Sequence, residues 1–336
     1  MDGPGLRPAP GPAPGLEKHV FGLLKKTADL KGRIGLAFAP DHIALAVVSR
    51  SGERAVLERC EQLPLNSSDA EAAASALRAA ALPRLPVSVV LRSEDYQLTL
   101  VEAPDVPPAE LRAAMRWRLK EAIDIPVEEA VIDVFEVPPQ NRGAQGRMMY
   151  AVAARRAAVA RYSAALAALP AFDVVDVPEL CLRNLAAALP TAAKGVALLH
   201  LGGTMANVIL VQGRTFYFAR QMSLQPAAGA RETPDGQRGG ESGPAPDAAS
   251  IVLELQRSLD YYERHFDQPP ITRIAILPAG PRADSLAVEL ARETGFEVSA
   301  LDLSAALHCP APLTPATQAG CVLAAGAAMR EERRTL

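Results

Sequence analysis

Residues 195–222, GVALLHLGGTMANVILVQGRTFYFARQM, place the strongest constraint on the fold of this chain. Their apolar runs are interrupted first at positions 202–203 and again at positions 212–214, which is the pattern of three successive strands joined by two tight turns. The first run, residues 196–201, is apolar on both faces, as in strands that are covered on both sides. The stretch therefore predicts a strand meander built around a buried central strand.

The first turn of this meander has two alternative interpretations. Gly202 and Gly203 leave the backbone bare there, and Thr204 adds a hydroxyl group at the tip. Glycine allows a backbone to approach a ligand closely, and successive N–H groups in a turn can hold a phosphate. A plain hairpin explains the same residues without a ligand. The turn alone leaves both interpretations open.

The length of 336 residues exceeds one typical core, so two lobes of roughly 150 residues each are expected. Residues 33–65 have the pattern strand, turn, strand, turn, strand, with a hairpin signal at positions 51–52. An alanine-rich helix at 68–80 and a buried strand at 87–91 follow. Together they predict one α/β layer unit.

A helix is predicted from Pro107-Pro108 to Ile123, because proline is favoured at a helix start and Glu110 suits the positive end of the helix dipole. Its apolar stripe consists of Leu111, Ala114, Met115, Leu119, Ala122 and Ile123. Trp117 lies off this stripe. We favour packing of Trp117 against a neighbouring element, and the alternative is contact with a partner. An antiparallel strand pair (131–137 and 148–153), a helix (156–169), a strand (174–177) and a second helix (179–189) complete the first lobe.

Residues 226–249 are rich in Gly, Pro and charge, and they predict a disordered loop. A helix follows, with one apolar face formed by Ile251, Leu255, Leu259, Tyr262 and Phe266. A buried strand, a Gly/Pro turn, a helix and a second strand come next, and an alanine-rich helix at 317–329 closes the chain. Residues 277–282, where a strand passes through a loop into a helix, form a second place for a nucleotide.

Composition excludes several functional classes. The net charge of −3 argues against a general nucleic-acid binder. The four cysteines lack C-x-x-C spacing, so they form neither a metal knuckle nor a disulfide framework and are expected to be small core residues in a reducing compartment. No Ser/His/Asp set, phosphate-loop motif or metal-spaced cluster supports a free-standing metabolic enzyme.

The N-terminal residues favour a cytoplasmic protein. Residues 1–15 alternate Pro, Gly and Ala, which predicts disorder and provides no apolar core for a signal peptide. No apolar run approaches the ~20 residues needed to span a bilayer. The next segment, VFGLLKKTADLKG, combines apolar side chains with lysines. We favour a plain lead-in helix there, and the alternative is a short foot on an anionic membrane surface.

These segments, in this order, resemble the PilM family of type IV pilus assembly proteins, and more closely its MshI relatives of MSHA pili. The resemblance is carried by FGLLKKTADLKGRIGLAF, PPAELRAAMRWRLKEAIDIPVEEAVIDVFEV, the meander above, LELQRSLDYYERHF with RIAILPAG, and AGCVLAAGAAMR. It covers about nine tenths of the chain, and the joint order of the motifs is more specific than any one of them.

The resemblance implies an α/β, actin-like two-lobed fold built of two ribonuclease-H-like α/β units, with a reduced second lobe. It divides the chain into a tail and basic lead-in (1–32), a first lobe (33–190) with an inserted partner-binding subdomain at about 104–170, and a second lobe (191–336). The last helix, at about 315–330, is expected to return to the first lobe.

The resemblance also places a nucleotide cleft, formed here by Gly35, Asp41, His200, Gly202, Gly203, Thr204 and Gly280. In the first motif Ala37 stands near the place of the expected aspartate, with Asp41 beyond the turn, and in the second motif His200 replaces the aspartate. Mg²⁺ prefers hard oxygen ligands, for which a neutral imidazole is a poor substitute. A single glycine, Gly280, remains in the adenosine loop. We therefore expect a degenerate site without catalytic residues, metal ligands or cofactor: a pseudo-ATPase.

By the same resemblance, the expected function is that of a cytoplasmic scaffold at the inner face of the inner membrane. The expected partner is a PilN-like bitopic membrane protein, held by its cytoplasmic N-terminal peptide, and other pilus platform proteins would join it. Membrane association would be peripheral and would occur through these partners. Leu111, Arg112, Met115 and Trp117 are our candidates for peptide contact. The alternative is an active actin-like ATPase or nucleotide-binding switch that binds ATP and Mg²⁺.

Overall fold

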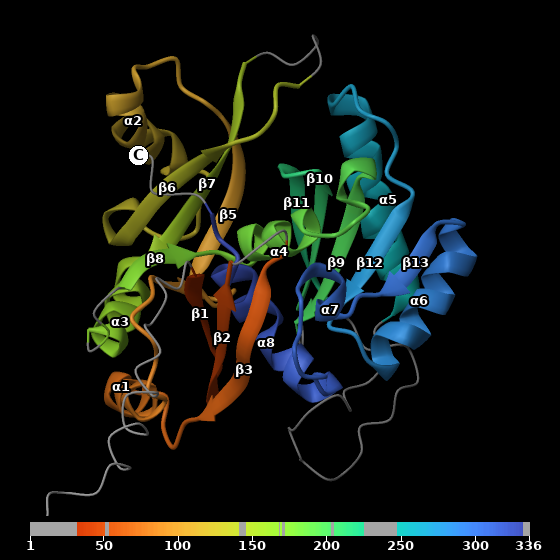
Figure 1. Ribbon diagram of the computed structural model, residues 1–336. Coiled ribbons are helices and arrows are strands. Elements are labelled where there is room, and N and C mark those ends of the chain that lie inside the picture. The colour runs from red at the N-terminus through yellow and green to blue at the C-terminus, as the bar shows by residue number, and fades with distance from the viewer. Residues whose placement is uncertain are drawn as a thin grey trace, which may run out of the picture.

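The computed structural model of this chain describes residues 32–50, 54–140, 146–167, 169, 172–202, 205–224 and 247–331. Within these residues the strands form two five-stranded sheets and one three-stranded sheet (Figure 1). The N-terminal lead-in, together with Gly203 and Thr204, lies outside the described residues.

The first sheet is built on the predicted meander of residues 33–65. The strands β1 (Gly32–Phe38), β2 (His42–Ser49) and β3 (Val56–Pro64) pair antiparallel, and β4 (Val87–Val90) and β8 (Phe172–Asp176) then add parallel to β1 and to β4. The order across the sheet is β3-β2-β1-β4-β8. Parallel strands are joined by crossover connections, and here α1 (Ala70–Ala79) precedes β4 and α3 (Arg156–Leu166) precedes β8.

The second sheet repeats this topology. The strands β9 (Val196–Gly202), β10 (Met205–Gln212) and β11 (Thr215–Ser223) form the antiparallel meander predicted at the start, and β12 (Arg273–Leu277) and β13 (Glu297–Ala300) add parallel beyond β9. The order β11-β10-β9-β12-β13 corresponds strand for strand to that of the first sheet. The predicted fold of two related α/β units is thereby confirmed.

The helices begin where the sequence provides caps and apolar faces. The helix bounds are α1 (Ala70–Ala79), α2 (Leu111–Leu119), α3 (Arg156–Leu166), α4 (Pro178–Ala187), α5 (Ala248–His265), α6 (Pro281–Thr294), α7 (Leu303–Ala306) and α8 (Pro315–Ala328). The Asp247 carboxylate accepts hydrogen bonds from the first N–H groups of α5, so the last three residues of the predicted disordered segment 226–249 are a cap and a helix start. Residues 225–246 lie outside the described residues.

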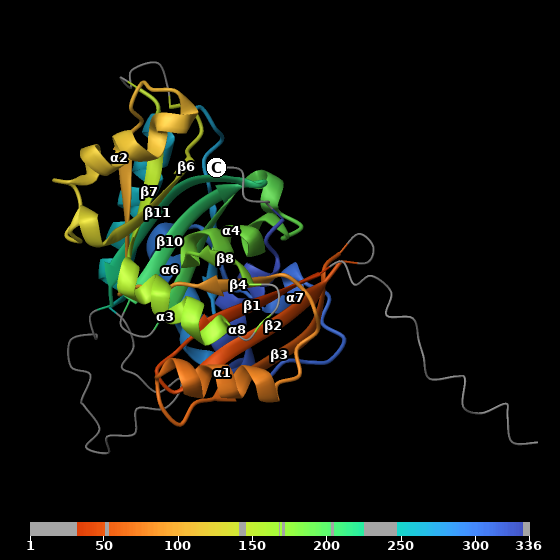
Figure 2. The ribbon, with the colours of Figure 1, turned by 90° about the vertical axis from the view of Figure 1, so that its left-hand side faces the viewer.

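A small sheet is inserted in the first lobe, in the order β5-β7-β6, from β5 (Tyr96–Glu102), β7 (Met148–Arg155) and β6 (Ala130–Glu136). This subdomain was expected at about 104–170, but β5 begins before that range. The helix α3 lies inside the range, yet it packs against α1 in the core of the first lobe (Figure 2). The subdomain therefore spans residues 96–155.

Strand β2 is buried on both faces, and the size of its side chains differs between them. Ile43, Leu45 and Val47 pack with α1 and α3, whereas Ala44 and Ala46 belong to a second core cluster that includes α8. Gly35 of β1 pairs with Ala46 and meets the backbone of α8. Small residues on this face allow a helix that is itself rich in alanine to approach the sheet closely.

Each sheet is covered by the helix that ends the other half of the chain. The helix α8 packs against β1, β2, β3 and β4, whereas α4 packs against β9, β10 and β11 (Figure 1). The two helices cross where a side chain on Gly326 would meet the carbonyl oxygen of Cys181 at 2.3 Å. One cluster of buried apolar residues therefore contains residues of both lobes. Among the described residues, no helix is long and apolar enough to cross a bilayer.

Candidate functional site

The β1–β2 turn carries Asp41, the carboxylate that the sequence placed in the cleft. Its side chain is 83% exposed, and its Oδ1 lies 2.8 Å from Nδ1 of the neighbouring His42. This hydrogen bond lowers the pKa of Asp41. Ala37, inside β1, cannot replace it, because a methyl group offers no oxygen. The first turn thus provides an ionised carboxylate, but one that faces solvent and its own neighbour.

The β9–β10 hairpin carries His200, which lies opposite Asn207 in the strand register. Both side chains are buried, and burial lowers the pKa of His200 to about 4. Among the described residues, neither Nδ1 of His200 nor Oδ1 of Asn207 has a hydrogen-bond partner. A neutral imidazole beside an amide provides no negative charge for Mg²⁺, so the residues present do not fit that ion. Nor do the described residues contain any cluster of three or more potential metal-ligating side chains.

The glycines predicted in the cleft have different roles. A Cβ atom on Gly35 would lie 1.9 Å from the carbonyl oxygen of Ala324 and 2.7 Å from the backbone nitrogen of Ala328. The packing of α8 therefore accounts for the glycine at position 35, and a role of Gly35 in the cleft stays a prediction. Gly202 ends β9, and a Cβ atom added to it would lie 3.4 Å from Cε1 of His200, which is ordinary van der Waals contact. Gly203 and Thr204 lie outside the described residues.

Gly280 is the residue that the predicted adenosine loop needs for its backbone. Its φ of +154° is one that residues with a side chain rarely adopt. Gly280 is also the N-cap residue of α6, which starts at Pro281. The carbonyl oxygen of Gly280 accepts a hydrogen bond from the Asp284 N–H at 2.9 Å. Burial lowers the pKa of Arg282, the second residue of α6. The loop after β12 is thus a helix start with one glycine, as predicted.

A polar cavity of about 130 Å³ lies between the inserted sheet, the start of α4 and β11. It is lined by Tyr96, Gln97, Leu98, Glu179, Ala219 and Gln221. The Tyr96 hydroxyl group lies 2.9 and 2.8 Å from the two carboxylate oxygens of Glu179 and donates its proton to them. Burial raises the pKa of Glu179. Sequence reasoning missed this pair, because no local pattern reveals that Glu179 becomes buried.

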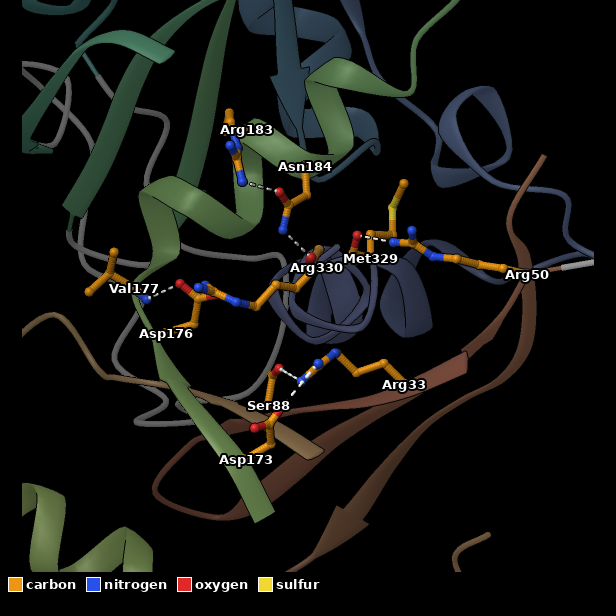
Figure 3. A network of polar contacts seen from close by, with 11 residues as sticks. Arg33, Arg50, Ser88, Asp173, Asp176, Val177, Arg183, Asn184, Met329 and Arg330 are labelled. Atoms are coloured by element: carbon orange, nitrogen blue, oxygen red, sulfur yellow. Dashed lines mark hydrogen bonds and ion pairs between the residues drawn. The ribbon is translucent and has the colours of Figure 1, made fainter. Parts of the chain in front are cut away.

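A polar network ties the residues after α8 to the first sheet and to α4 (Figure 3). Arg330 forms an ion pair with Asp176 at 2.8 Å, and Asn184 of α4 donates a hydrogen bond to the Gly326 carbonyl oxygen at 2.9 Å. Glu331 forms ion pairs with Arg50 at the end of β2 and with Arg214 in the β10–β11 turn. Residues 329–331 therefore contact the first sheet and the β10–β11 turn of the second sheet.

The helix α2 presents the residues predicted to bind a partner, and the structure divides them. Leu111 and Met115 are buried against the inserted sheet, so they cannot contact a partner directly, which corrects that expectation. Trp117 is 82% exposed, so the prediction that it packs within the chain is wrong. Arg112 lies 3.5 Å from Asp133 and is partly exposed. The outward face of α2 thus presents Trp117 without an intramolecular cover.

The comparisons with known proteins agree with this geometry. Two meander-based sheets with exchanged helices define the class of two-lobed, actin-like proteins, and this chain has that fold. In particular, it is similar to a chain of the "PilM-PilN type IV pilus biogenesis complex", with a TM-score of 0.65 and 19% identity over 89% of this chain and 98% of that chain. No protein-family model matches the sequence, and no curated protein matches it.

Two further solved structures are more distant. One is a protein of unknown function with an actin-like ATPase fold from Bacteroides thetaiotaomicron, with a TM-score of 0.49 and 7% identity over 85% of this chain and 96% of that one. The other is the cytoplasmic domain of EpsL, an inner-membrane component of the type II secretion system of Vibrio cholerae, with a TM-score of 0.47 and 15% identity over 90% and 96%.

Proposed function

We propose that this chain is a cytoplasmic scaffold of a type IV pilus inner-membrane platform, of the MSHA-like kind that the sequence resembles. It holds a PilN-like bitopic protein by the cytoplasmic N-terminal segment of that protein, and it reaches the inner face of the membrane through this partner and other platform proteins. The observation that carries the proposal is the similarity to a chain of the PilM–PilN complex over nearly the full length of both chains.

The scaffold works without ATP hydrolysis and without a resident cofactor. The absence of hydrolysis is inferred from the residues of the two turns: Asp41 in the β1–β2 turn faces solvent, and His200 before the β9–β10 turn is buried and neutral. Without a fixed carboxylate the cleft has no anchor for Mg²⁺, which phosphate chemistry of this kind requires.

The partner peptide contacts the outward face of α2. An exposed tryptophan is the side chain that most often dominates a binding interface, and Arg112 stands on the same helix. Leu111 and Met115 support this face from beneath by anchoring α2 to the inserted sheet. No catalytic residue is needed, because an apolar anchor and a nearby charge suffice to hold a short peptide.

The experiment that tests the proposal uses a labelled peptide with the cytoplasmic N-terminal sequence of a PilN-like bitopic protein. Fluorescence anisotropy would measure its dissociation constant with the full chain. We expect Trp117→Ala to weaken binding by roughly 30-fold, the effect of losing a hot-spot residue, and Arg112→Glu to weaken it in the same direction. Val288→Ala, at a residue of α6 that is 72% exposed, is the matched control and should leave the dissociation constant unchanged. Equal binding by all four proteins would refute the assignment of α2.

A further inference from the structure

Two cysteines that are far apart in the chain face each other between β3 and α8. Cys60 of β3 and Cys321 of α8 are both free thiols. Sγ of Cys321 also lies 3.6 Å from the carbonyl oxygen of Glu61, the residue after Cys60. Sγ of Cys60 lies 3.9 Å from the carbonyl oxygen of Thr317, one turn before Cys321. Each sulfur thus lies beside the backbone of the other residue's element.

The close approach of α8 to β3 is fixed by a glycine. A Cβ atom on Gly320 would lie 1.7 Å from Nε2 of Gln62, so the side chain of Gln62 occupies the space that glycine leaves open. Gln62 and Cys60 stand on the same face of β3, because strand side chains alternate. The two thiols are therefore held together by the packing of a whole helix against a strand, and not by a mobile loop.

The two thiols differ in their access to solvent and in their acidity. Cys60 is half-buried, whereas Cys321 is fully buried. The neighbouring Cys321 thiol lowers the pKa of Cys60, whereas the neighbouring Cys60 thiol and burial raise the pKa of Cys321. The thiolate is the reactive form of cysteine, so Cys60 is the residue that meets an oxidant first and Cys321 is placed to react second.

We propose that Cys60 and Cys321 form a redox-sensitive pair that closes into a disulfide when the protein meets hydrogen peroxide. The Cys60 thiolate attacks one peroxide oxygen, the O–O bond breaks, and the leaving hydroxide takes up a proton to give water. The resulting sulfenic acid, Cys60–S–OH, is attacked by the sulfur of Cys321. The S–S bond forms, the S–O bond breaks, and the hydroxide leaves as a second water with the proton of Cys321. The two cysteines lose two electrons, which the peroxide gains.

The disulfide changes how the last helix is held. It joins β3, at the edge of the first sheet, to the helix that crosses from the second half of the chain. The loop that it closes contains most of the chain, and cross-links that close long loops restrict the unfolded state most. We therefore expect oxidation to raise the midpoint of thermal unfolding by roughly 5 °C or more. Dithiothreitol should reverse the rise.

The test treats the reduced full chain with hydrogen peroxide, blocks remaining thiols with N-ethylmaleimide under denaturing conditions, and maps the peptides by mass spectrometry. The expected result is a linked pair of peptides containing Cys60 and Cys321, with the intact mass lower by two hydrogens. The thermal midpoint should rise in the same sample. This mapping uses the unmodified protein, so it does not depend on whether a variant folds.

Two single variants sharpen the result. Cys60→Ser should abolish both the cross-link and the rise in thermal midpoint, whereas Cys309→Ser should keep both. Cys309 is the matched control, because it is also half-buried and stands near Cys60 but has no hydrogen bond to it in the described structure. Recovery of Cys60 and Cys321 as alkylated thiols after other residues have oxidised would overturn the proposal, and so would a Cys60–Cys309 cross-link as the main product.

Discussion

Arg330, just beyond the last helix, places its guanidinium Nη1 2.8 Å from Oδ2 of Asp176 at the end of β8. The side chains are only 17% and 1% exposed, so both charges of this pair have been taken out of water. A second oxygen of Asp176 accepts a hydrogen bond from the Val177 N–H at 3.0 Å. The closing helix is therefore attached to the first sheet by a buried ion pair as well as by apolar packing.

Removing one partner of this pair leaves the other charge buried. We expect Arg330→Ala to lower the free energy of unfolding by about 3–5 kcal/mol in urea denaturation. Arg264→Ala is the control, since its ion pair with Asp260 has side chains that are 77% and 64% exposed and should contribute less than about 1 kcal/mol. Similar losses in the two variants would contradict the interpretation of the pair as a buried attachment.

Gly35 provides a test of the packing between the lobes. Gly35→Ala places a methyl group against the backbone of α8, which cannot move without separating the helix from β1, so we expect a loss of at least about 3 kcal/mol. Gly213→Ala is a matched change. Its φ is +59°, but no atom lies within 4 Å of the added Cβ, so backbone strain alone should cost about 1 kcal/mol. The ratio of the two losses, measured by urea denaturation, separates close packing from strain.

His200 predicts how stability depends on pH. Its pKa is about 4 in the folded protein and 6.5 in a free side chain. Between these values the unfolded chain binds a proton that the folded protein does not, so acid favours unfolding and this contribution to stability is lost as the pH falls from 6.5 towards 4. Relative to His200→Leu, the native chain should lose about 3 kcal/mol between pH 7 and pH 4. The exposed His308, changed to Gln, serves as the control and should leave the native slope intact.

The degenerate cleft predicts the outcome of nucleotide titration. Isothermal titration of the full chain with ATP and Mg²⁺ should show no saturable binding, and phosphate release should stay at the level of a blank, because the described cleft has no fixed carboxylate to anchor the metal. Micromolar binding that disappears in Gly203→Asp would overturn this expectation and favour an ATPase or a nucleotide switch.

Trp117 is the single tryptophan of the chain, so its fluorescence reports on one position. An 82% exposed indole should be quenched readily by acrylamide, and Trp117→Ala should change the free energy of unfolding by less than about 0.5 kcal/mol. Addition of the partner peptide should shift the emission to shorter wavelength and protect it from quenching. Emission that is already protected in the free protein would show that the indole is covered within the chain.

Much of the fold was predictable because successive antiparallel strands and their turns have a recognisable pattern in a short stretch of sequence. Runs of apolar residues broken by Gly-containing turns predicted β9, β10 and β11, and the similar pattern at 33–65 predicted the first three strands. The apolar stripe of α5 also became a buried face, with Ile251 and Leu255 inaccessible to solvent. Strand β5 was missed, although its partner β7 was predicted, since the pairing of β5 with β7 joins segments about fifty residues apart.

The candidate site was predictable only in part. The sequence showed that carboxylates are missing from positions 37 and 200, and side-chain identity alone settles that a methyl group or an imidazole is no oxygen ligand for Mg²⁺. It did not show that Glu179 is buried against Tyr96, that Trp117 is exposed, or that Gly35 serves α8. Each of these depends on which distant surface covers a residue.

By itself, then, the sequence determined the two strand meanders, the positions of most helices and the chemical types available in the cleft, because periodicity, turns and side-chain identity are local properties. Only the tertiary structure decided that α4 covers the second sheet, that Arg330 meets Asp176 and that Cys60 lies beside α8, close to Cys321. The ion pair of Arg330 with Asp176 and the approach of the two thiols each join residues that are more than one hundred and fifty positions apart. They exist because each sheet buries an apolar face under a helix from the other half of the chain, which brings distant residues together.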